Sequence, residues 1–278
     1  MTQDPASLKS MPLYRDVERI YNELKAAGLQ SGSRLSVTDL AAFDQYHYHG
    51  TDAVDLAITS LDINASDRVL EIGSGIGGPA RYIAEKTGAT VVALELQPDL
   101  DATARDLTRR CGLSDRVEHV CADAPDYSPG AERFDAIVSW LALFHIAQRG
   151  RLLANCMQWL APTGGLYVED LYARGELTKA EQEVLATILY SRYLPDLETY
   201  EADFRAAGFN SIQVDDMSEP WRHFTRERYD DFCRDRERHE KVHGTAIVAG
   251  LDNFYGAVAG LFAGGNLGGV RLTGKHTR

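Results

Sequence analysis

Short apolar runs alternate with amphipathic segments along the chain from Asp67 to about residue 175. The intervening segments repeat their apolar residues at helical spacing, and they end in Gly or in Pro-Thr-Gly-Gly. Strands that alternate with helices in this way form βαβ crossovers, so the pattern predicts a parallel sheet covered by helices on both faces. The five runs with the length of buried strands are 68–73, 90–96, 117–123, 134–143 and 164–172.

Helix-rich segments flank this predicted core. Residues 1–66 read as helices without a strand, an insertion spans about 173–195, and another helical segment occupies 220–262. Two late apolar runs, 211–218 and 268–276, predict two further strands. Because no linker is long enough to require two independent domains, we expect one α/β domain. Its parts are a helical lid (1–66), a core (67–175), and insertion helices with C-terminal strands (176–278).

The composition narrows the class of protein. With 29 Lys and Arg against 41 Asp and Glu, the 278 residues carry a net charge of −12, which disfavours partners rich in phosphate, namely nucleic acids and membrane surfaces. Four widely spaced cysteines show no CxxC and no His at ligand spacing, so we expect reduced thiols and no metal site. The first residues lack an apolar signal region, and the apolar stretch 246–263 is interrupted by Asp252 and Asn253, which favours a buried helix. A cytoplasmic enzyme acting on a small molecule is the resulting expectation.

A glycine-rich turn joins the first predicted strand to the helix that begins near Pro79. Its sequence is Gly73-Ser-Gly-Ile-Gly-Gly78. Glycines at such a turn let the backbone approach a ligand closely, and the next helix offers unpaired N–H groups. Because Gly73, Gly75 and Gly78 also fit G-x-G-x-x-G, a dinucleotide-binding turn and a purely structural turn are the alternatives.

Acidic residues near this turn favour a positively charged ligand. Glu71 lies two residues before the first glycine, which suits an amino group and a sulfonium and is unfavourable beside a pyrophosphate. No basic residues near the turn are arranged for a diphosphate. Glu95 lies close to the offset of about 20 residues expected for an acid that binds ribose hydroxyls. Since both cofactors contain ribose, Glu95 does not discriminate between them, and a solvated strand-end carboxylate is its alternative. We therefore expect an adenosyl sulfonium rather than NAD.

Four segments together resemble the class I S-adenosylmethionine-dependent methyltransferases: VLEIGSGIGGPARYIA, VVALELQPDL, the turn around Asp123, and FDAIVSW followed by FHI. The resemblance covers about 66–175, and the terminal strand pair extends it to the C-terminus. It implies a Rossmann-like, doubly wound sheet of seven strands, mostly parallel, with the last strand antiparallel. The stretches 44–50, 143–172 and 192–209 resemble more narrowly the small-molecule N-methyltransferases of the sarcosine/dimethylglycine and phosphoethanolamine type.

The resemblance implies which residues bind S-adenosylmethionine. Glu71 lies near the methionyl amine, Glu95 binds the ribose, and Asp123 hydrogen-bonds the adenine amino group. The remaining cofactor contacts come from the glycine turn and from the ends of strands two to four, namely Gly73, Ser74, Gly75, Gly77, Leu96, Ala124, Ser139 and Trp140.

Three residues are candidates for the methyl-accepting site. His145 follows the fourth strand, where the resembled enzymes use a histidine with a lid tyrosine, and an imidazole suits a general base. Its alternative is a histidine that buttresses the next helix. Tyr46 is the candidate lid residue, with a buried aromatic seam as its alternative. Glu169 ends the fifth strand beside Asp170 and is expected to orient the acceptor, although strand alternation places only one of this pair inward. The charged segment 221–243 reads mainly as a solvated helical face.

These observations predict methyl transfer to a small-molecule acceptor, with nitrogen as the expected acceptor atom. Many relatives carry an acid after the serine of strand four, whereas this chain has Trp140 and Leu141. That departure makes an O- or C-methyltransferase acting on an aromatic or polyketide-like natural product the alternative, because Trp140 can stack on such an acceptor. An NAD-dependent oxidoreductase and a non-catalytic binding protein are the competing classes. A homodimer is compatible with the sequence.

Overall fold

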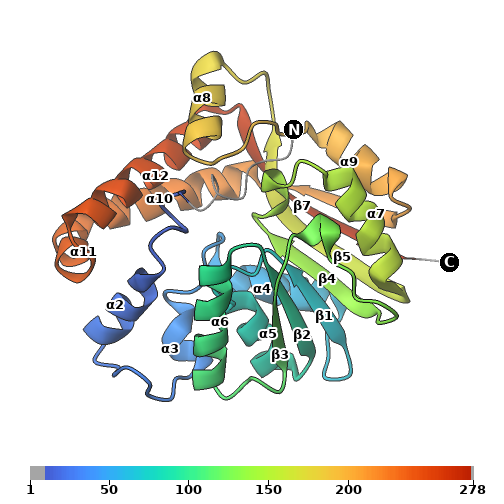
Figure 1. Ribbon diagram of the computed structural model, residues 1–278. Helices are drawn as coiled ribbons and strands as arrows, with labels where there is room; N and C mark the ends of the chain where they lie inside the picture. Colours follow the sequence, from blue (N-terminus) through green and yellow to red (C-terminus); the bar gives the residue numbers. More distant parts are fainter. Residues whose placement is uncertain (1–9, 277–278) are drawn as a thin grey trace.

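The computed structural model describes residues 10–276, and a seven-stranded sheet forms its centre (Figure 1). The strand order is β3-β2-β1-β4-β5-β7-β6. β1 to β5 pair in parallel, whereas β7 runs antiparallel to both β5 and β6. Both the expected α/β fold and the expected antiparallel last strand are confirmed. The strands are β1 (Arg68–Ile72), β2 (Thr90–Glu95), β3 (Val117–Cys121), β4 (Phe134–Trp140), β5 (Leu160–Ala173), β6 (Asn210–Asp216) and β7 (Leu267–Lys275).

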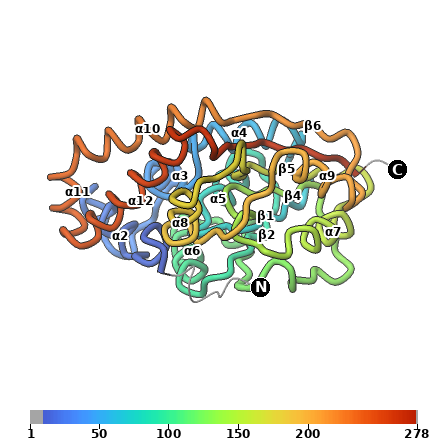
Figure 2. Tube along the Cα trace, turned by 90° about the horizontal axis from the view of Figure 1, so that it is seen from above, coloured from blue at the N-terminus to red at the C-terminus, as the bar shows by residue number. Residues whose placement is uncertain are grey.

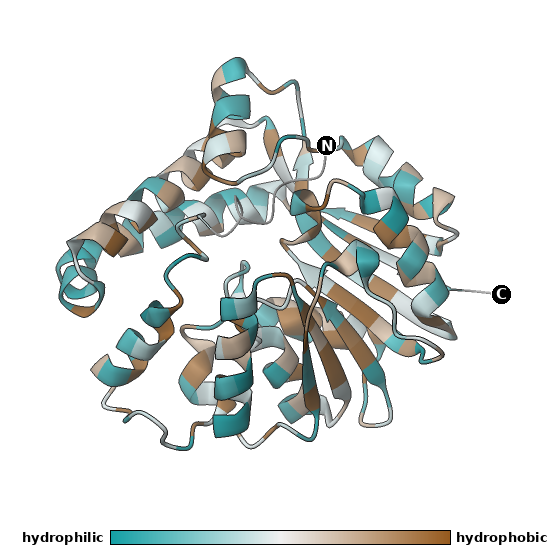
Figure 3. Ribbon diagram, viewed as in Figure 1, coloured by the Kyte–Doolittle hydropathy of each residue, from teal (hydrophilic) through white to brown (hydrophobic). Residues whose placement is uncertain are grey.

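Helices cover both faces of the sheet, because the central strands are apolar on both sides. On one face, α4 (Gly50–Leu61) and α5 (Gly78–Thr87) pack against β1, β2 and β4 in one apolar cluster. On the other face, α7 (Arg149–Trp159) and α9 (Leu197–Ala206) form a second cluster with β4, β5 and β7. α6 (Pro98–Arg110) follows β2 and packs with the N-terminal helices. Figure 3 shows the strands as largely hydrophobic between these layers.

The N-terminal and C-terminal helices meet beyond the carboxyl ends of the parallel strands. α10 (Ser218–Arg234) and α12 (Thr245–Gly264) run side by side away from the sheet, and α11 (Arg236–His243) joins their far ends. α11 contacts α2 (Glu18–Ala26), and both views place these two helices together (Figures 1 and 2). The shorter elements are α3 (Val37–Ala41), α8 (Lys179–Thr187), and the 3₁₀ turns η1 (Ala124–Asp126) and η2 (Leu143–His145).

The apolar stretch expected to form a buried helix is α12. By length and composition alone it is the one described helix that qualifies for crossing a membrane, and 39% of its apolar window is buried by the rest of the chain. One face, which includes Leu251, Phe254 and Val258, packs into the fold. α12 therefore provides part of the wall above the sheet rather than only an exposed apolar surface.

Candidate active site

One cavity opens at the carboxyl ends of β1 to β5, where open α/β sheets bind their ligands. Its empty volume is about 1550 Å³ when its open mouth is included. The floor is formed by residues that follow the strands, and the roof by residues 11–14, residues 44–48, α10 and α12. Eleven of the fourteen predicted site residues line it: Tyr46, Glu71, Gly73, Ser74, Gly75, Glu95, Leu96, Asp123, Ala124, Trp140 and His145.

The glycine turn has a conformation that requires glycine at its first position. Gly73 has φ +76°, and a Cβ atom there would collide with the side chain of Ala142. The amides of Gly73 and Ser74 donate to the Leu94 carbonyl at 2.9 and 3.0 Å, while the Gly75 amide donates to Glu95 Oε2 at 2.8 Å. These bonds join the turn to the end of β2, so the predicted ribose-binding carboxylate lies directly beside the turn.

Glu71 has an unsatisfied carboxylate oxygen that fits the positively charged end of the expected cofactor. The residue is only 2% exposed, lines the cavity, and its Oε2 atom has no hydrogen-bond partner. Burial raises its pKa to about 8, and the pKa of Glu95 is similarly raised to about 7. A ligand ammonium or sulfonium placed beside Glu71 would supply a positive counter-charge and so favour the ionised form of its carboxylate.

Two predicted cofactor residues lie behind the cavity wall. Gly77 precedes the first residue of α5 and has φ +80°, and a Cβ atom there would come within 2.8 Å of both Arg81 and His119. Ser139 is fully buried, and its hydroxyl donates to the Ile72 carbonyl at 2.9 Å, which links β4 to β1. Their positions support the shape of the site rather than contact with a ligand.

The lid turn is anchored by a buried ion pair that the sequence analysis missed. Arg81 Nη2 lies 2.8 Å from Asp44 Oδ2, and both side chains are 0% exposed. Gly78 allows this approach, because a Cβ atom there would collide with the Asp44 carbonyl. The turn carries Tyr46 over Gly75, where an added Cβ atom would lie 3.9 Å from Tyr46 Cδ2. The position of Tyr46 therefore fits the predicted role as a lid over the cofactor turn.

His145 lies in η2 on the cavity wall, directly after β4. Burial lowers its pKa to about 3, so its imidazole is neutral near pH 7, and both buried ring nitrogens lack a hydrogen-bond partner. The ring packs on Phe144 at a centroid distance of 3.8 Å, and Tyr14 meets it edge-on at 6.2 Å. Tyr14 also lines the cavity. Sequence reasoning missed it because no pattern connects it to His145.

Glu169 is not among the cavity-lining residues. Its Oε1 accepts a hydrogen bond from the Tyr167 hydroxyl at 2.6 Å and forms an ion pair with Arg271 at 2.9 Å. The residue is 2% exposed and lies on β5, directly opposite Arg271 of β7. The ion pair with Arg271 and the place of Glu169 outside the cavity lining do not favour the expected role in orienting an acceptor, which stays a prediction. Asp170, the other strand-end acid, accepts a bond from the Tyr200 hydroxyl at 2.6 Å.

The part of the cavity away from the glycine turn is apolar and aromatic. Trp140 packs against His47 at a centroid distance of 5.4 Å, and burial lowers the pKa of His47 to about 4. Arg228 of α10 reaches this part of the cavity and is the one Arg or Lys among the described lining residues. The apolar residues of this part include Met11, Leu13, Phe144, Leu171, Leu189, Phe254 and Val258.

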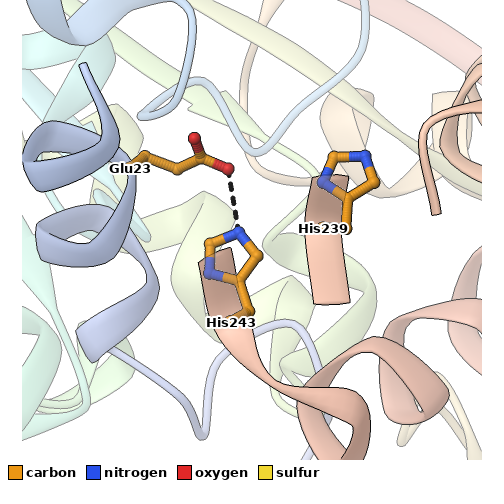
Figure 4. A group of neighbouring side chains, drawn as sticks. All are labelled: Glu23, His239 and His243. Carbon is orange, nitrogen blue, oxygen red and sulfur yellow. Dashed lines mark hydrogen bonds and ion pairs between the residues drawn. The ribbon is translucent and has the colours of Figure 1, made fainter. Parts of the chain in front are cut away.

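One group of metal-ligating side chains lies between α2 and α11. The candidate ligand atoms of Glu23, His239 and His243 lie within 4.8 Å of one another (Figure 4). Sequence analysis overlooked the two histidines, which are four residues apart on one helix. The Glu23 carboxylate is already engaged, because His243 Nε2 lies 2.8 Å from it and Arg238 binds both of its oxygens. The group therefore functions in this structure as an ion-paired contact between the two helices.

The family match and the relatives identify the chemistry. The family described as "Methyltransferase domain" matches residues 69–164. Methyltransferase GfsG of Streptomyces halstedii is 31% identical over 187 residues, which cover 66% of this chain and 67% of the relative. Phosphoethanolamine N-methyltransferase 1 of Triticum aestivum is 32% identical over 163 residues, 58% of this chain, but the match spans only 32% of the wheat protein.

A solved structure supports the same assignment at the level of the fold. Phosphoethanolamine N-methyltransferase 2 of Haemonchus contortus, in complex with phosphomonomethylethanolamine and S-adenosylhomocysteine, superposes with a TM-score of 0.78. The match has 22% identity and covers 84% of this chain and 55% of that one. The NAD-dependent alternative is thereby set aside. The chain belongs to the S-adenosylmethionine-dependent methyltransferases, with S-adenosylmethionine as its cofactor.

Proposed function

We propose that the enzyme methylates a hydroxyl oxygen of a small, largely apolar acceptor. The observation that carries this proposal is the lining of the cavity beyond the glycine turn. That lining is apolar and aromatic, and the acidic lining residues (Asp44, Glu71, Glu95 and Asp123) all belong to the cofactor side or its lid. An amine acceptor that binds as a cation would lack a carboxylate partner there. The sequence expectation of an aromatic or polyketide-like acceptor fits this lining better than the expectation of a nitrogen acceptor.

Residues at one end of the cavity would bind the cofactor, and residues at the other end would bind the acceptor. When bound, S-adenosylmethionine supplies an electrophilic methyl group. Glu71, Glu95 and Asp123 would hold its amino, ribose and adenine groups, and the glycine turn would contact it through backbone atoms. Trp140 and the apolar roof would position the acceptor and exclude water. His145 would accept the hydroxyl proton, because it lines the cavity directly after β4 and both of its ring nitrogens lack a hydrogen-bond partner.

Methyl transfer to nitrogen is the second candidate. The relative from Triticum aestivum carries the name phosphoethanolamine N-methyltransferase and is 32% identical, but this chain spans about a third of its length. A phosphorylated amine needs both a phosphate partner and room for an ammonium. Arg228 is the one cationic lining residue suited to the phosphate, since the pKa values of His47 and His145 are lowered. Transfer to nitrogen is therefore supported more by the similarity to the Triticum aestivum relative than by the residues that line the cavity.

A turnover screen distinguishes the two candidates. The full chain is incubated with S-adenosylmethionine and matched pairs of hydroxylated and aminated apolar molecules, together with phosphoethanolamine and glycine, and methylated products are identified by mass spectrometry. The expected result is transfer to hydroxylated apolar acceptors. Turnover confined to the polar amines would refute the proposal.

We further propose that the chain acts as a single domain in the cytoplasm. Its four free cysteines support the cytoplasmic location, because thiols stay reduced there.

A further inference from the structure

Arg228 places a single positive charge in the apolar part of the cavity. It lies on α10, on the helix face that turns toward α12 and the lid. Its guanidinium carbon lies 5.0 Å from the ring centroid of Tyr48, 5.3 Å from that of Phe224 and 4.8 Å from that of Tyr255. Three rings at this distance hold the guanidinium in place without neutralising its charge.

The charge of Arg228 is not balanced by a carboxylate. Its neighbours on α10 are paired on the solvent side, Arg222 with Glu219 at 2.6 Å and Arg226 with Asp230 at 2.9 Å. Within residues 10–276, by contrast, no carboxylate oxygen forms an ion pair with Arg228, and its buried Nε atom has no hydrogen-bond partner. A guanidinium cannot lose its proton, so a partly buried one that lacks a counter-charge favours an anionic ligand.

We infer that Arg228 binds a carboxylate of the methyl acceptor, which makes the acceptor an apolar molecule with one acidic group. This inference rests on the proposed function, because it assigns the apolar part of the cavity to the acceptor. The planar guanidinium presents donors that match the two oxygens of a carboxylate. Arg228 is thus a specificity-determining residue: it fixes the acidic end of the acceptor while the apolar lining holds the rest of the molecule near the cofactor turn.

The methionyl carboxylate of the cofactor is the alternative anionic group that Arg228 could bind. The cavity is continuous, so binding must be measured for the two ligands separately. S-adenosylhomocysteine reports on the cofactor side alone. Decanoate and its neutral counterpart decanamide, added to the S-adenosylhomocysteine complex, report on the apolar side and differ only in their charged group.

The experiment measures dissociation constants by titration calorimetry for the wild-type chain and for the R228Q, R228K and R226Q variants. In the wild type, decanoate is expected to bind about 10-fold or more tightly than decanamide. R228Q is expected to bring this ratio close to 1 without changing the affinity for decanamide or S-adenosylhomocysteine. R228K should keep part of the preference, because it retains the charge but loses the forked geometry. The exposed R226Q is the matched control and should behave as the wild type does.

Three results would overturn the inference. The first is a wild-type ratio near 1, or failure of both probes to bind. The second is a decanoate preference that survives in R228Q. The third is an R228Q variant with weakened S-adenosylhomocysteine binding, which would assign the charge to the cofactor. These binding measurements do not require turnover. The product screen therefore tests methyl transfer to oxygen separately from the role of Arg228.

Discussion

Tyr14 meets His145 edge to face across the cavity wall, with ring centroids 6.2 Å apart and an interplanar angle of 70°. Tyr14 comes from the segment that precedes α2, whereas His145 follows β4, so the contact joins the N-terminal segment to the part of the cavity wall that follows the sheet. Burial raises the pKa of Tyr14 well above its usual value, and Glu95 adds to this effect. Both side chains are therefore neutral at the pH at which a hydroxyl proton would be accepted.

Replacement of His145 should remove turnover and leave cofactor binding unchanged. The H145A variant is expected to lose about 10²- to 10⁴-fold in kcat, the usual contribution of a positioned base. The affinity for S-adenosylhomocysteine, measured by calorimetry, should stay within about 2-fold of the wild type, because Glu71 and Glu95 are untouched. Y14F tests the neighbouring ring and is expected to have a smaller effect. Turnover of H145A at the wild-type rate would remove His145 from the reaction.

Glu71 should make cofactor affinity depend on pH. Burial raises its pKa to about 8 in the free protein, so the carboxyl group is mostly protonated near pH 7 and must ionise to pair with a cationic ligand. The affinity for S-adenosylmethionine should therefore rise by roughly 10-fold per pH unit below about pH 8 and level off above it. E71Q should abolish this dependence, whereas E85Q, at an exposed position on α5, should retain it. An unchanged pH dependence in E71Q would contradict the assignment.

The strands and the glycine turn were predictable from the sequence, because each is encoded by residues that are adjacent along the chain. Each of the seven apolar runs became a strand within a few residues of its expected limits. The central strands gave the clearest signal, because a strand buried on both faces needs consecutive apolar residues. The antiparallel position of β7 came from the resemblance, because no periodicity specifies the direction of pairing. The glycine turn was also locally encoded: Gly73 and Gly78 occupy positions where a Cβ atom would collide with Ala142 or Asp44.

The acceptor side was less predictable because its contacts join distant segments. The carboxylate of Glu169 has a sequence position typical of a site residue, yet Arg271 reaches it across the sheet and pairs with it. Arg228 was hidden among the charges of 221–243, which mostly form a solvated face. Only the packing of α10 on α12 turns this one residue toward Tyr48 and the cavity. Sequence spacing along one helix does not reveal which charge lacks a partner.

Loss of the buried Asp44–Arg81 pair should destabilise the protein strongly. Both side chains are fully buried, and removal of one charge leaves the other without compensation. D44N is therefore expected to lower the free energy of unfolding by about 3 to 5 kcal/mol in chemical denaturation. D55N is the matched control, because Asp55 pairs with Lys86 on the surface and should cost less than about 1 kcal/mol. Equal effects of the two substitutions would show that burial does not govern the contribution of the pair.

The contact between α2 and α11 should weaken in acid. Burial alone would raise the pKa of Glu23, but hydrogen bonds from His243 and Arg238 outweigh it and hold the pKa at about 2, compared with an ordinary value of 4.5. A folded-state pKa below the unfolded-state value means that the stabilisation is fully present above about pH 4.5 and is lost as the pH falls toward 2.

E23Q should remove this stabilisation at neutral pH, lowering the free energy of unfolding by about 1 to 3 kcal/mol, because it leaves Arg238 and His243 without their common carboxylate. The difference between E23Q and the wild type should shrink between about pH 4.5 and pH 2, where the wild-type carboxylate becomes protonated. E18Q, at an exposed position on the same helix, is the control and should follow the wild type at every pH. A difference that stays constant across this range would mean that shape, rather than the charge of Glu23, joins the N-terminal helix to α11.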